Sequence, residues 1–485
     1  MKRIFYLLFF SLAFSSCVNL DLEPQQSIDP KVAYKTLNDC ENAVRGIYLQ
    51  SISVYASDYI VIADAFCDNV ISFSQGRNSL LKYRNWELNS SDNCIWSDPY
   101  AAIVDCNLLL LNLKIPEKAD SEYFSFSHIK AEAFAMRALM HFELVRQHGK
   151  AYHIASEDDL GVPYVVTVNA ENKQERGKVK DNYNKILADL NAAYALMDGS
   201  ESYDSSIGKT RLRKHAVAAL LSRVYLTMHK YDESALYAQL AIDGSSRLSE
   251  NKICALVDFK NVWRDKSDKG VYFNLPYVKN LGLVPGNRYN QLMDFKFKSE
   301  FVVPRSFAHL FSSSDIRKVS YLYTSEYNGH KANHIIKHSG DLTDKNKINK
   351  VSLRIIRGAE MYLTLAEAKF RGTSPNSEQE ALAALNVLRR ERGVLYAVDV
   401  LEGKSLIAEI MKQRRLELAF EWDRYHTIKR LGMDIERVVG EGDLVDGSGR
   451  PNTAFILRST DYRFQFPIPG AEMDANPNMV QNLGY

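Results

Sequence analysis

Cysteine is scarce in this sequence, and no cysteine motif is present. Six cysteines occur in 485 residues, without a CxxC pair or a Cys/His cluster at zinc-ligand spacing. Apart from Cys17 near the start, an odd number remains: Cys40, Cys67, Cys94, Cys106 and Cys254. At least one thiol is therefore free, or the whole set is buried as small apolar groups. A disulfide framework is not the basis of this fold.

An excess of charge of one sign is also lacking. The chain has 61 basic and 59 acidic residues, so its formal net charge is only +2. No run of basic residues is interleaved with aromatic residues, which is the footprint that nucleic-acid binding requires. The sequence therefore argues against a nucleic-acid partner.

Signatures of known catalytic chemistry are missing. The sequence contains no GxSxG, HExxH, Walker or dinucleotide motif, and its eleven histidines are scattered. Two close pairs, His141 with Glu143 and Asp423 with His426, lie within predicted helices, where such side chains are usually solvated or hydrogen-bonded. We expect no metal, no cofactor and no enzymatic activity. Sequence spacing does not test a glycosidase carboxylate pair, because the separation of its two carboxyl groups is spatial.

The N-terminus has the order of a secretory signal. Lys2 and Arg3 precede a mostly apolar run at 4–14, which is followed by Ser-Ser and then Cys17. The run is too short to cross a membrane. A cysteine directly after small residues predicts a lipoprotein signal, with removal of residues 1–16 and lipidation of Cys17, although Phe stands at position 14 where Leu is usual. Ordinary signal cleavage is the alternative. No later stretch has 18 unbroken apolar residues, so we expect a globular chain on a lipid anchor.

Helical periodicity covers much of the remaining chain. Two predicted helix pairs resemble tetratricopeptide units, and alanines such as Ala219 and Ala238 occupy positions where paired helices approach closely. No regular repeat of about 34 residues is present, so the predicted scaffold is degenerate and interrupted. The pairs are 214–226 with 233–242 and 357–370 with 378–392. Other helices are predicted at 37–49, 59–71, 99–113, 128–148 and 181–197, the last capped by Asp181, with a strand at 271–275.

The stretch 407–432 predicts one long, largely buried helix. Arg414, Glu417, Glu421 and Arg424 fall in one stripe of this helix at spacings of three and four. A partly buried ionic ladder that fixes helix packing explains this stripe more simply than a catalytic carboxylate pair, because buried charges survive mainly when they are paired.

The same stretch carries a family resemblance. RRLELAFEWDRYHTIKRLG resembles the late helix of SusD/RagB-type outer-membrane lipoproteins. The end of the chain agrees with the family's terminal PIP, E, NP and QN-x-GY run, through Phe466-Pro467-Ile468-Pro469, Glu472, Asn476-Pro477 and Gln481-Asn482-Leu483-Gly484-Tyr485. The resemblance implies a mainly α fold, in which a degenerate tetratricopeptide-like scaffold carries long irregular loops. It also implies a lipidated tether at 17–30 and a single helical domain at 31–485.

The resemblance also implies a function. Proteins similar to SusD capture a glycan at the cell surface and pass it to a SusC-like TonB-dependent transporter, without a reaction. RagB-like members are associated with peptide uptake, so a peptide is the alternative ligand. A helical protein-interaction scaffold and a surface-attached degradative enzyme are the remaining hypotheses.

In such proteins the inserted loops carry the ligand site, which corresponds here to 72–98 and 254–350. Sugar binding requires flat aromatic rings for stacking and planar groups for the hydroxyls. The turn at Pro285-Gly286-Asn287 is expected to present its neighbours to solvent. Trp96 has an alternative role, because it precedes Tyr100 and Ile103 at helical spacing and could pack the start of that helix. The predicted ligand-binding residues are Arg77, Trp86, Trp96, Trp263, Tyr277, Arg288 and Tyr289.

Overall fold

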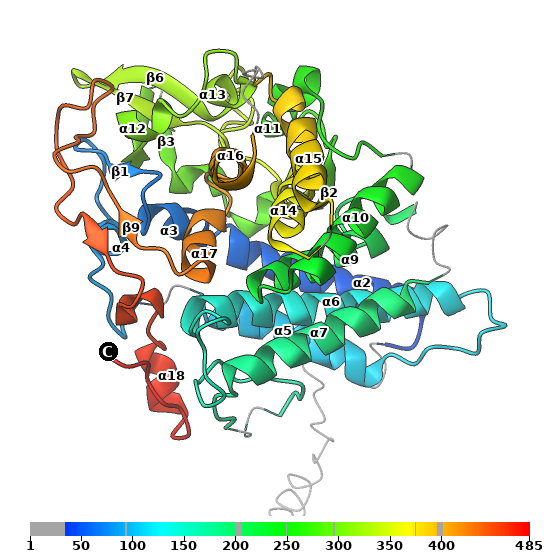
Figure 1. The fold of residues 1–485 in the computed structure, drawn as a ribbon. Coiled ribbons are helices and arrows are strands. Elements are labelled where there is room, and N and C mark those ends of the chain that lie inside the picture. The colour runs from blue at the N-terminus through cyan, green and yellow to red at the C-terminus, as the bar shows by residue number, and fades with distance from the viewer. Residues whose placement is uncertain are drawn as a thin grey trace, which may run out of the picture.

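The structure is a computed structural model, and it describes residues 34–92, 95–169, 171, 173–198, 206–248, 250–293, 296–373, 375–394 and 401–485 (Figure 1). Only the backbone is described for 290–293 and 296. The predicted signal, Cys17, the tether and Cys94 lie outside these residues. Throughout the described chain, each helix is too short or too polar to cross a bilayer.

Helices form the scaffold, and they pack largely in chain order. Each helix contacts the next one in the order α2, α5, α6, α7, α9, α10, α14 and α15. The helix α16 then contacts both α14 and α15 (Figure 1). This order confirms the predicted mainly α scaffold of helix pairs. The long helices are α2 (Leu37–Tyr55), α5 (Ser97–Asn112), α6 (Tyr123–His148), α7 (Val179–Leu196), α9 (Lys214–Thr227), α10 (Tyr231–Arg247), α14 (Gly358–Arg371), α15 (Ser377–Glu391), α16 (Gly403–Glu417) and α17 (Asp423–Arg430).

Small residues allow the α9–α10 pair to approach closely. Ala219 and Ala238 are 1% and 0% exposed. Ser222 Oγ donates to the carbonyl of Ser234 at 2.8 Å, and Ser234 Oγ donates to the carbonyl of Ser222 at 2.9 Å. Only short side chains permit this reciprocal contact between two backbones, so a larger residue would overpack the pair.

The prediction of one helix at 407–432 is wrong, because the chain breaks between α16 and α17. Phe420 and Trp422 have φ of 67° and 64°, in the left-handed region. The break is stabilised from the 254–350 insertion. Lys337 Nζ donates to the carbonyls of Glu417 (3.0 Å) and Ala419 (2.7 Å), and His338 Nε2 lies 2.8 Å from the carbonyl oxygen of Phe420. These partners satisfy backbone groups that a continuous helix would have used internally.

Three local predictions also need correction. The helix expected at 59–71 ends early, because α3 spans Tyr59–Ala65. The loop expected at 72–98 contains a short helix, α4 (Leu81–Asn85). Asp181 does not cap α7, which begins at Val179 and has Lys178 at its N-cap; Asp181 lies in the first turn instead. There its charge still complements the helix dipole.

The strands are short and antiparallel. A four-stranded sheet has the order β1-β5-β7-β6, with β1 (Ile71–Ser72), β5 (Phe301–Val302), β7 (His330–Ile335) and β6 (Leu322–Tyr327). The predicted strand at 271–275 is confirmed as β2 (Val271–Leu275), which pairs with β8 (Leu353–Arg357). The other elements are β3 (Asn290–Met293), β4 (Lys296–Ser299), β9 (Ile435–Glu436), β10 (Ile456–Leu457), α11 (Phe259–Trp263), α12 (Arg305–Ala308), α13 (Ile316–Tyr321) and α18 (Gly470–Ala475).

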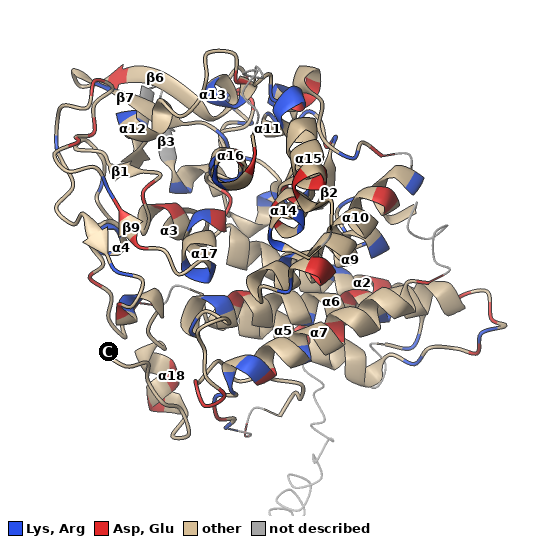
Figure 2. Ribbon diagram, viewed as in Figure 1, with Lys and Arg blue, Asp and Glu red and all other residues tan. Residues whose placement is uncertain are grey.

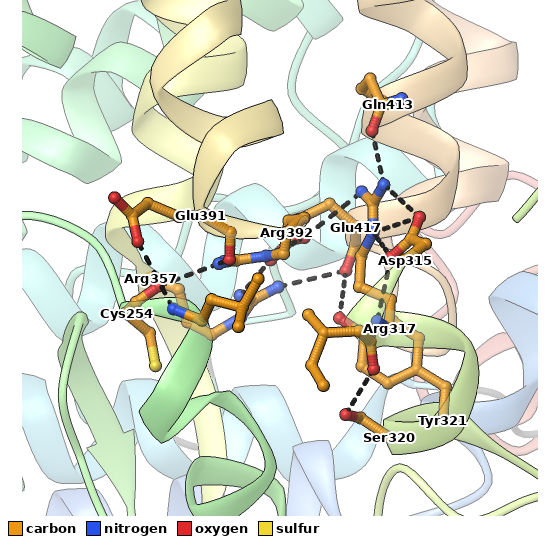
Figure 3. Close-up of polar contacts among 12 residues, drawn as sticks. Cys254, Asp315, Arg317, Ser320, Tyr321, Arg357, Glu391, Arg392, Gln413 and Glu417 are labelled. Carbon is orange, nitrogen blue, oxygen red and sulfur yellow. Dashed lines mark hydrogen bonds and ion pairs between the residues drawn. The ribbon is translucent and has the colours of Figure 1, made fainter. Parts of the chain in front are cut away.

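A buried ionic cluster joins the insertion to α14, α15 and α16. The carboxylate of Glu417 accepts from Arg392 Nε at 2.8 Å and Arg357 Nη1 at 2.7 Å, and Arg317 Nη1 lies 3.5 Å away (Figure 3). Burial alone would raise the pKa of Glu417, but Arg392, Arg357 and Arg317 outweigh burial and hold that pKa well below its usual range. Glu421 pairs with Arg357 and Lys337. These carboxylates are structural ion-pair partners of neighbouring elements, as predicted, but the break between α16 and α17 interrupts the predicted stripe.

Charge is dispersed over the fold rather than collected on one face. In Figure 2, blue and red segments are interspersed along the helices and the loops.

The free cysteines among the described residues are all buried: Cys40, Cys67, Cys106 and Cys254. Burial raises the pKa of these thiols, for Cys254 to about 11, so they behave as small core residues.

Candidate functional site

The two predicted loop regions meet at the edge of the four-stranded sheet. β1, which leads into the first region at Ser72, pairs with β5, from the second, in the register Ile71 with Val302 and Ser72 with Phe301. The contact continues past the strand, where the N–H of Phe73 donates to the carbonyl of Glu300 at 3.1 Å. Segments more than 200 residues apart therefore lie side by side at this edge.

Two buried carboxylates hold the loop that follows β1. Asp443 accepts from the N–H groups of Ser74 (2.7 Å) and Arg450 (2.6 Å). Glu300 accepts from the N–H of Leu80 at 3.3 Å. Gly76 lies tightly on the insertion, since an added Cβ would come within 2.8 Å of a backbone oxygen of residue 299. Backbone N–H groups bonded to carboxylates fix the loop before any ligand arrives.

Arg77 and Glu300 form the polar part of this surface. The side chain of Arg77 is 49% exposed, and its Nε lies 3.6 Å from Oε2 of Glu300, whose side chain is only 3% exposed. Within the described residues, this oxygen accepts no hydrogen bond. The pair thus presents a planar, half-exposed donor, and the buried carboxylate of Glu300 behind it holds the guanidinium in position.

Tyr323 supplies an exposed aromatic ring on the same sheet. Cα pairing runs across the strands from Ile71 to Val302, from Val302 to His334 and from His334 to Tyr323. At about 4.8 Å per strand, this row is about 14 Å long. Tyr323 is 47% exposed, and its ring centroid lies 5.2 Å from that of buried Phe297, which supports it. We call the surface formed by Arg77, Glu300 and Tyr323 the loop surface.

Sequence reasoning missed Tyr323, although a signal for its strand was present. The chain turns between β6 and β7 at Asn328-Gly329, and both residues have positive φ, 51° and 80°. An Asn-Gly pair between two β-like runs is the strongest short-range sign of a hairpin. Assigning that hairpin would have placed Tyr323 on a strand. Its exposure depends on the packing of the sheet.

The core contains four of the predicted aromatic residues: Trp86, Trp96, Trp263 and Tyr289. Trp86 is 4% exposed, and its Nε1 donates to the carbonyl of Phe66 at 2.8 Å. Trp263 is 2% exposed and packs edge-on against Tyr321. Tyr289 is 1% exposed, and its hydroxyl donates to the carbonyl of Ile60 at 2.6 Å. The expectation that the 285–287 turn presents Tyr289 to solvent is wrong, because the chain folds this ring back onto α3.

The other predicted residues are dispersed. Arg288 is partly exposed and pairs with Asp58 at 2.6 Å. Tyr277 is half-buried and follows Pro276, which lines a separate pocket beside α2. Trp96 is 5% exposed at the start of α5 and packs against Tyr100 with a centroid distance of 5.2 Å. Of the predicted set, only Arg77 lies on the loop surface.

The helical His and carboxylate pairs have structural partners. Asp423 pairs with Arg414, and His426 Nε2 lies 2.9 Å from the Tyr59 hydroxyl. His141 accepts from the N–H of Val165 at 3.0 Å, and burial lowers its pKa to about 3. Glu143 accepts from Tyr55 at 2.9 Å and pairs with Arg146. Across the described chain, histidines, cysteines and acidic residues form no group of three or more that could hold a metal ion.

Comparisons with known proteins match both halves of the chain. A family model described as starch-binding associating with outer membrane matches residues 21–226, and the SusD family model matches residues 314–485. The chain is 24% identical to SusD-like protein P2 of Formosa agariphila, with 98% of each chain covered.

Solved structures agree with the family models. A putative sugar binding protein from Bacteroides vulgatus superposes with a TM-score of 0.79 at 25% identity, covering 93% of this chain and 99% of that one. A SusD superfamily protein from Bacteroides thetaiotaomicron gives a TM-score of 0.77 at 25% identity, with 92% and 100% covered.

Proposed function

Because the chain belongs to the SusD/RagB family, we propose that it is a cell-surface glycan-binding protein of the outer membrane and that the loop surface binds the glycan. The observation that carries this placement is the meeting of the two inserted loop regions at β1 and β5. Tyr323, an exposed ring, lies on β6 of the same sheet, and the Arg77–Glu300 pair lies in the segments that flank β1 and β5. The sugar's apolar face stacks on the ring, and its hydroxyls accept hydrogen bonds from the Arg77 guanidinium.

Affinity electrophoresis tests this proposal. The protein is run in gels containing soluble starch, xylan, mannan or pectin, and retardation by one polymer identifies the ligand class. Tyr323→Ala should weaken binding about 2- to 12-fold, because ring stacking contributes about 0.5 to 1.5 kcal/mol beyond burial. Tyr462→Ala is the matched control, because Tyr462 is 40% exposed and lies away from the sheet near the C-terminus.

Arg77→Ala should weaken binding in the same assay, while Arg458→Ala, which removes an exposed arginine paired with Asp434, should not. Unchanged retardation of the folded Arg77→Ala/Tyr323→Ala double variant would refute this placement of the site. Retardation by none of the polymers, together with binding of peptides in calorimetry, would favour the peptide alternative. Release of new reducing ends from a retarding polymer would contradict a purely binding role.

We further propose that the protein is anchored through lipid on Cys17 and delivers its ligand to a SusC-like TonB-dependent transporter. The signal-like N-terminus and the family description support this assignment. Co-purification from detergent-solubilised membranes tests the partnership. A TonB-dependent transporter should be recovered in near-equal amount with the tagged protein, and its absence after crosslinking would contradict the proposal.

A further inference from the structure

A pocket of about 370 Å³ lies between α5, residues 163–169 and 173–174, and α18, and it shares no residue with the loop surface. Trp96, Tyr100 and Val104 line one wall; Tyr100 and Val104 share one face of α5, and Trp96 is the residue that precedes the helix. Val168 lies on the opposite segment, and Glu472 of α18 forms part of the rim. We call this cavity the α5–α18 pocket. Its volume lies within the range of small-ligand sites.

The apolar wall of this pocket is open to solvent. Val104 is 39% exposed and Val168 is 37% exposed. The aromatic residues behind them are fixed. The Tyr100 hydroxyl donates to the carbonyl of Pro163 at 2.9 Å, and Trp96 packs edge-on against His148 with a centroid distance of 5.0 Å. The wall is therefore a rigid apolar surface that needs no rearrangement to receive a ligand.

The polar rim is also held in place. Trp96 Nε1 donates to Oε2 of Glu472 at 3.2 Å, and Asn476 Nδ2 donates to Oε1 of Glu472 at 3.3 Å. Asn476 Nδ2 also donates to the carbonyl of Gln174 at 2.9 Å, which joins α18 to the opposite segment. Each carboxylate oxygen keeps lone-pair capacity for a second donor. Lys173 lies on the same rim, so positive and negative charge are balanced there.

From the fixed apolar wall and the fixed polar rim, we propose that the α5–α18 pocket is a second saccharide subsite, which holds one or two sugar rings. The inference rests on the proposed glycan-binding function. A fixed apolar wall matches the C–H face of a sugar ring, and an oriented carboxylate matches its hydroxyl donors. The balanced rim charge favours an uncharged sugar over an acidic or basic one. A glycan chain bound at two places gains avidity over a chain bound at one place.

Ligand-observed saturation-transfer NMR with maltose, cellobiose, xylobiose and mannobiose tests this subsite. Val104→Trp fills the pocket from α5, and Val168→Trp fills it from the opposite segment, so one variant remains usable if the other misfolds. Thermal melting checks both. In the Arg77→Ala/Tyr323→Ala background, at least one disaccharide should still receive saturation, and adding either filling substitution should reduce that signal at least tenfold.

The outcomes separate the subsite from the loop surface. If the Arg77→Ala/Tyr323→Ala variant loses all transfer while the filled variants keep it, the loop surface stands and the subsite is refuted. If the filled variants lose all transfer while the Arg77→Ala/Tyr323→Ala variant keeps it, the subsite stands and the loop surface is refuted. No transfer from the wild-type protein to any of the disaccharides would overturn the saccharide assignment of the pocket.

Discussion

The ionic cluster around Glu417 makes a quantitative prediction about stability. Glu417→Gln keeps the size of the side chain but removes the negative charge that Arg317, Arg357 and Arg392 share. The side chains of Arg317 and Arg392 are 0% exposed, so water does not compensate for the loss. Breaking a buried ion pair on one side costs about 3 to 5 kcal/mol. We expect a loss of folding stability of that size.

Thermal unfolding by circular dichroism measures this loss. With an unfolding entropy of about 2.1 cal/mol/K per residue, a chain of 485 residues has about 1 kcal/mol/K, so the melting temperature should fall by about 3 to 5 °C. Glu380→Gln is the matched control. Its side chain is 42% exposed and pairs with Lys369, so the expected loss is at most about 1 kcal/mol. Equal, small shifts in both variants would refute the argument that the Glu417 cluster is desolvated.

The pH dependence gives a second test of the same cluster. Burial would raise the pKa of Glu417, but its arginine partners lower it well below its unfolded value of about 4.3, so its stabilisation is present above that value. This stabilisation is lost as pH falls toward the folded-state pKa. The difference between wild type and Glu417→Gln should therefore shrink below pH 4.3. A difference that grows on acidification would contradict the assigned direction.

Three further predictions concern other parts of the chain. Cys17→Ser should release the protein from membranes into the soluble fraction; full retention, with no acyl label on the wild type, would show that the lipid anchor is wrong. Ala219→Leu should overpack the α9–α10 contact by about 1 to 3 kcal/mol and lower the melting temperature, whereas Ala101→Leu on the exposed face of α5 should not. Burial lowers the pKa of His148 to about 4 and of His141 to about 3, so the unfolded chain binds more protons below pH 6.5. Stability should thus be level above that pH and fall from pH 6.5 toward 4, and a flat urea-denaturation midpoint over this window would refute the burial of both imidazoles.

Sequence periodicity alone was sufficient to predict the helix pairs. The alanine spacing at Ala219 and Ala238 predicts close helix contact because helical geometry is local: residues three and four apart always share a face. The same reasoning failed between Glu417 and Asp423. Local propensity there favours a continuous helix, but Lys337 and His338, about 80 residues away in the chain, take the carbonyls and stabilise the break.

For the candidate site as well, the sequence predicted some features and not others. Loop composition and the family motifs were enough to choose the two regions that meet at β1 and β5, and Arg77 lies where they join. The sequence did not show which aromatic residues bind ligand, because an aromatic residue fits a core as well as a binding surface. Only the packing of α3 against the insertion buries Tyr289, and only the edge position of β6 leaves Tyr323 exposed. Burial is a property of contacts between distant segments, so tertiary structure alone decided which rings face solvent.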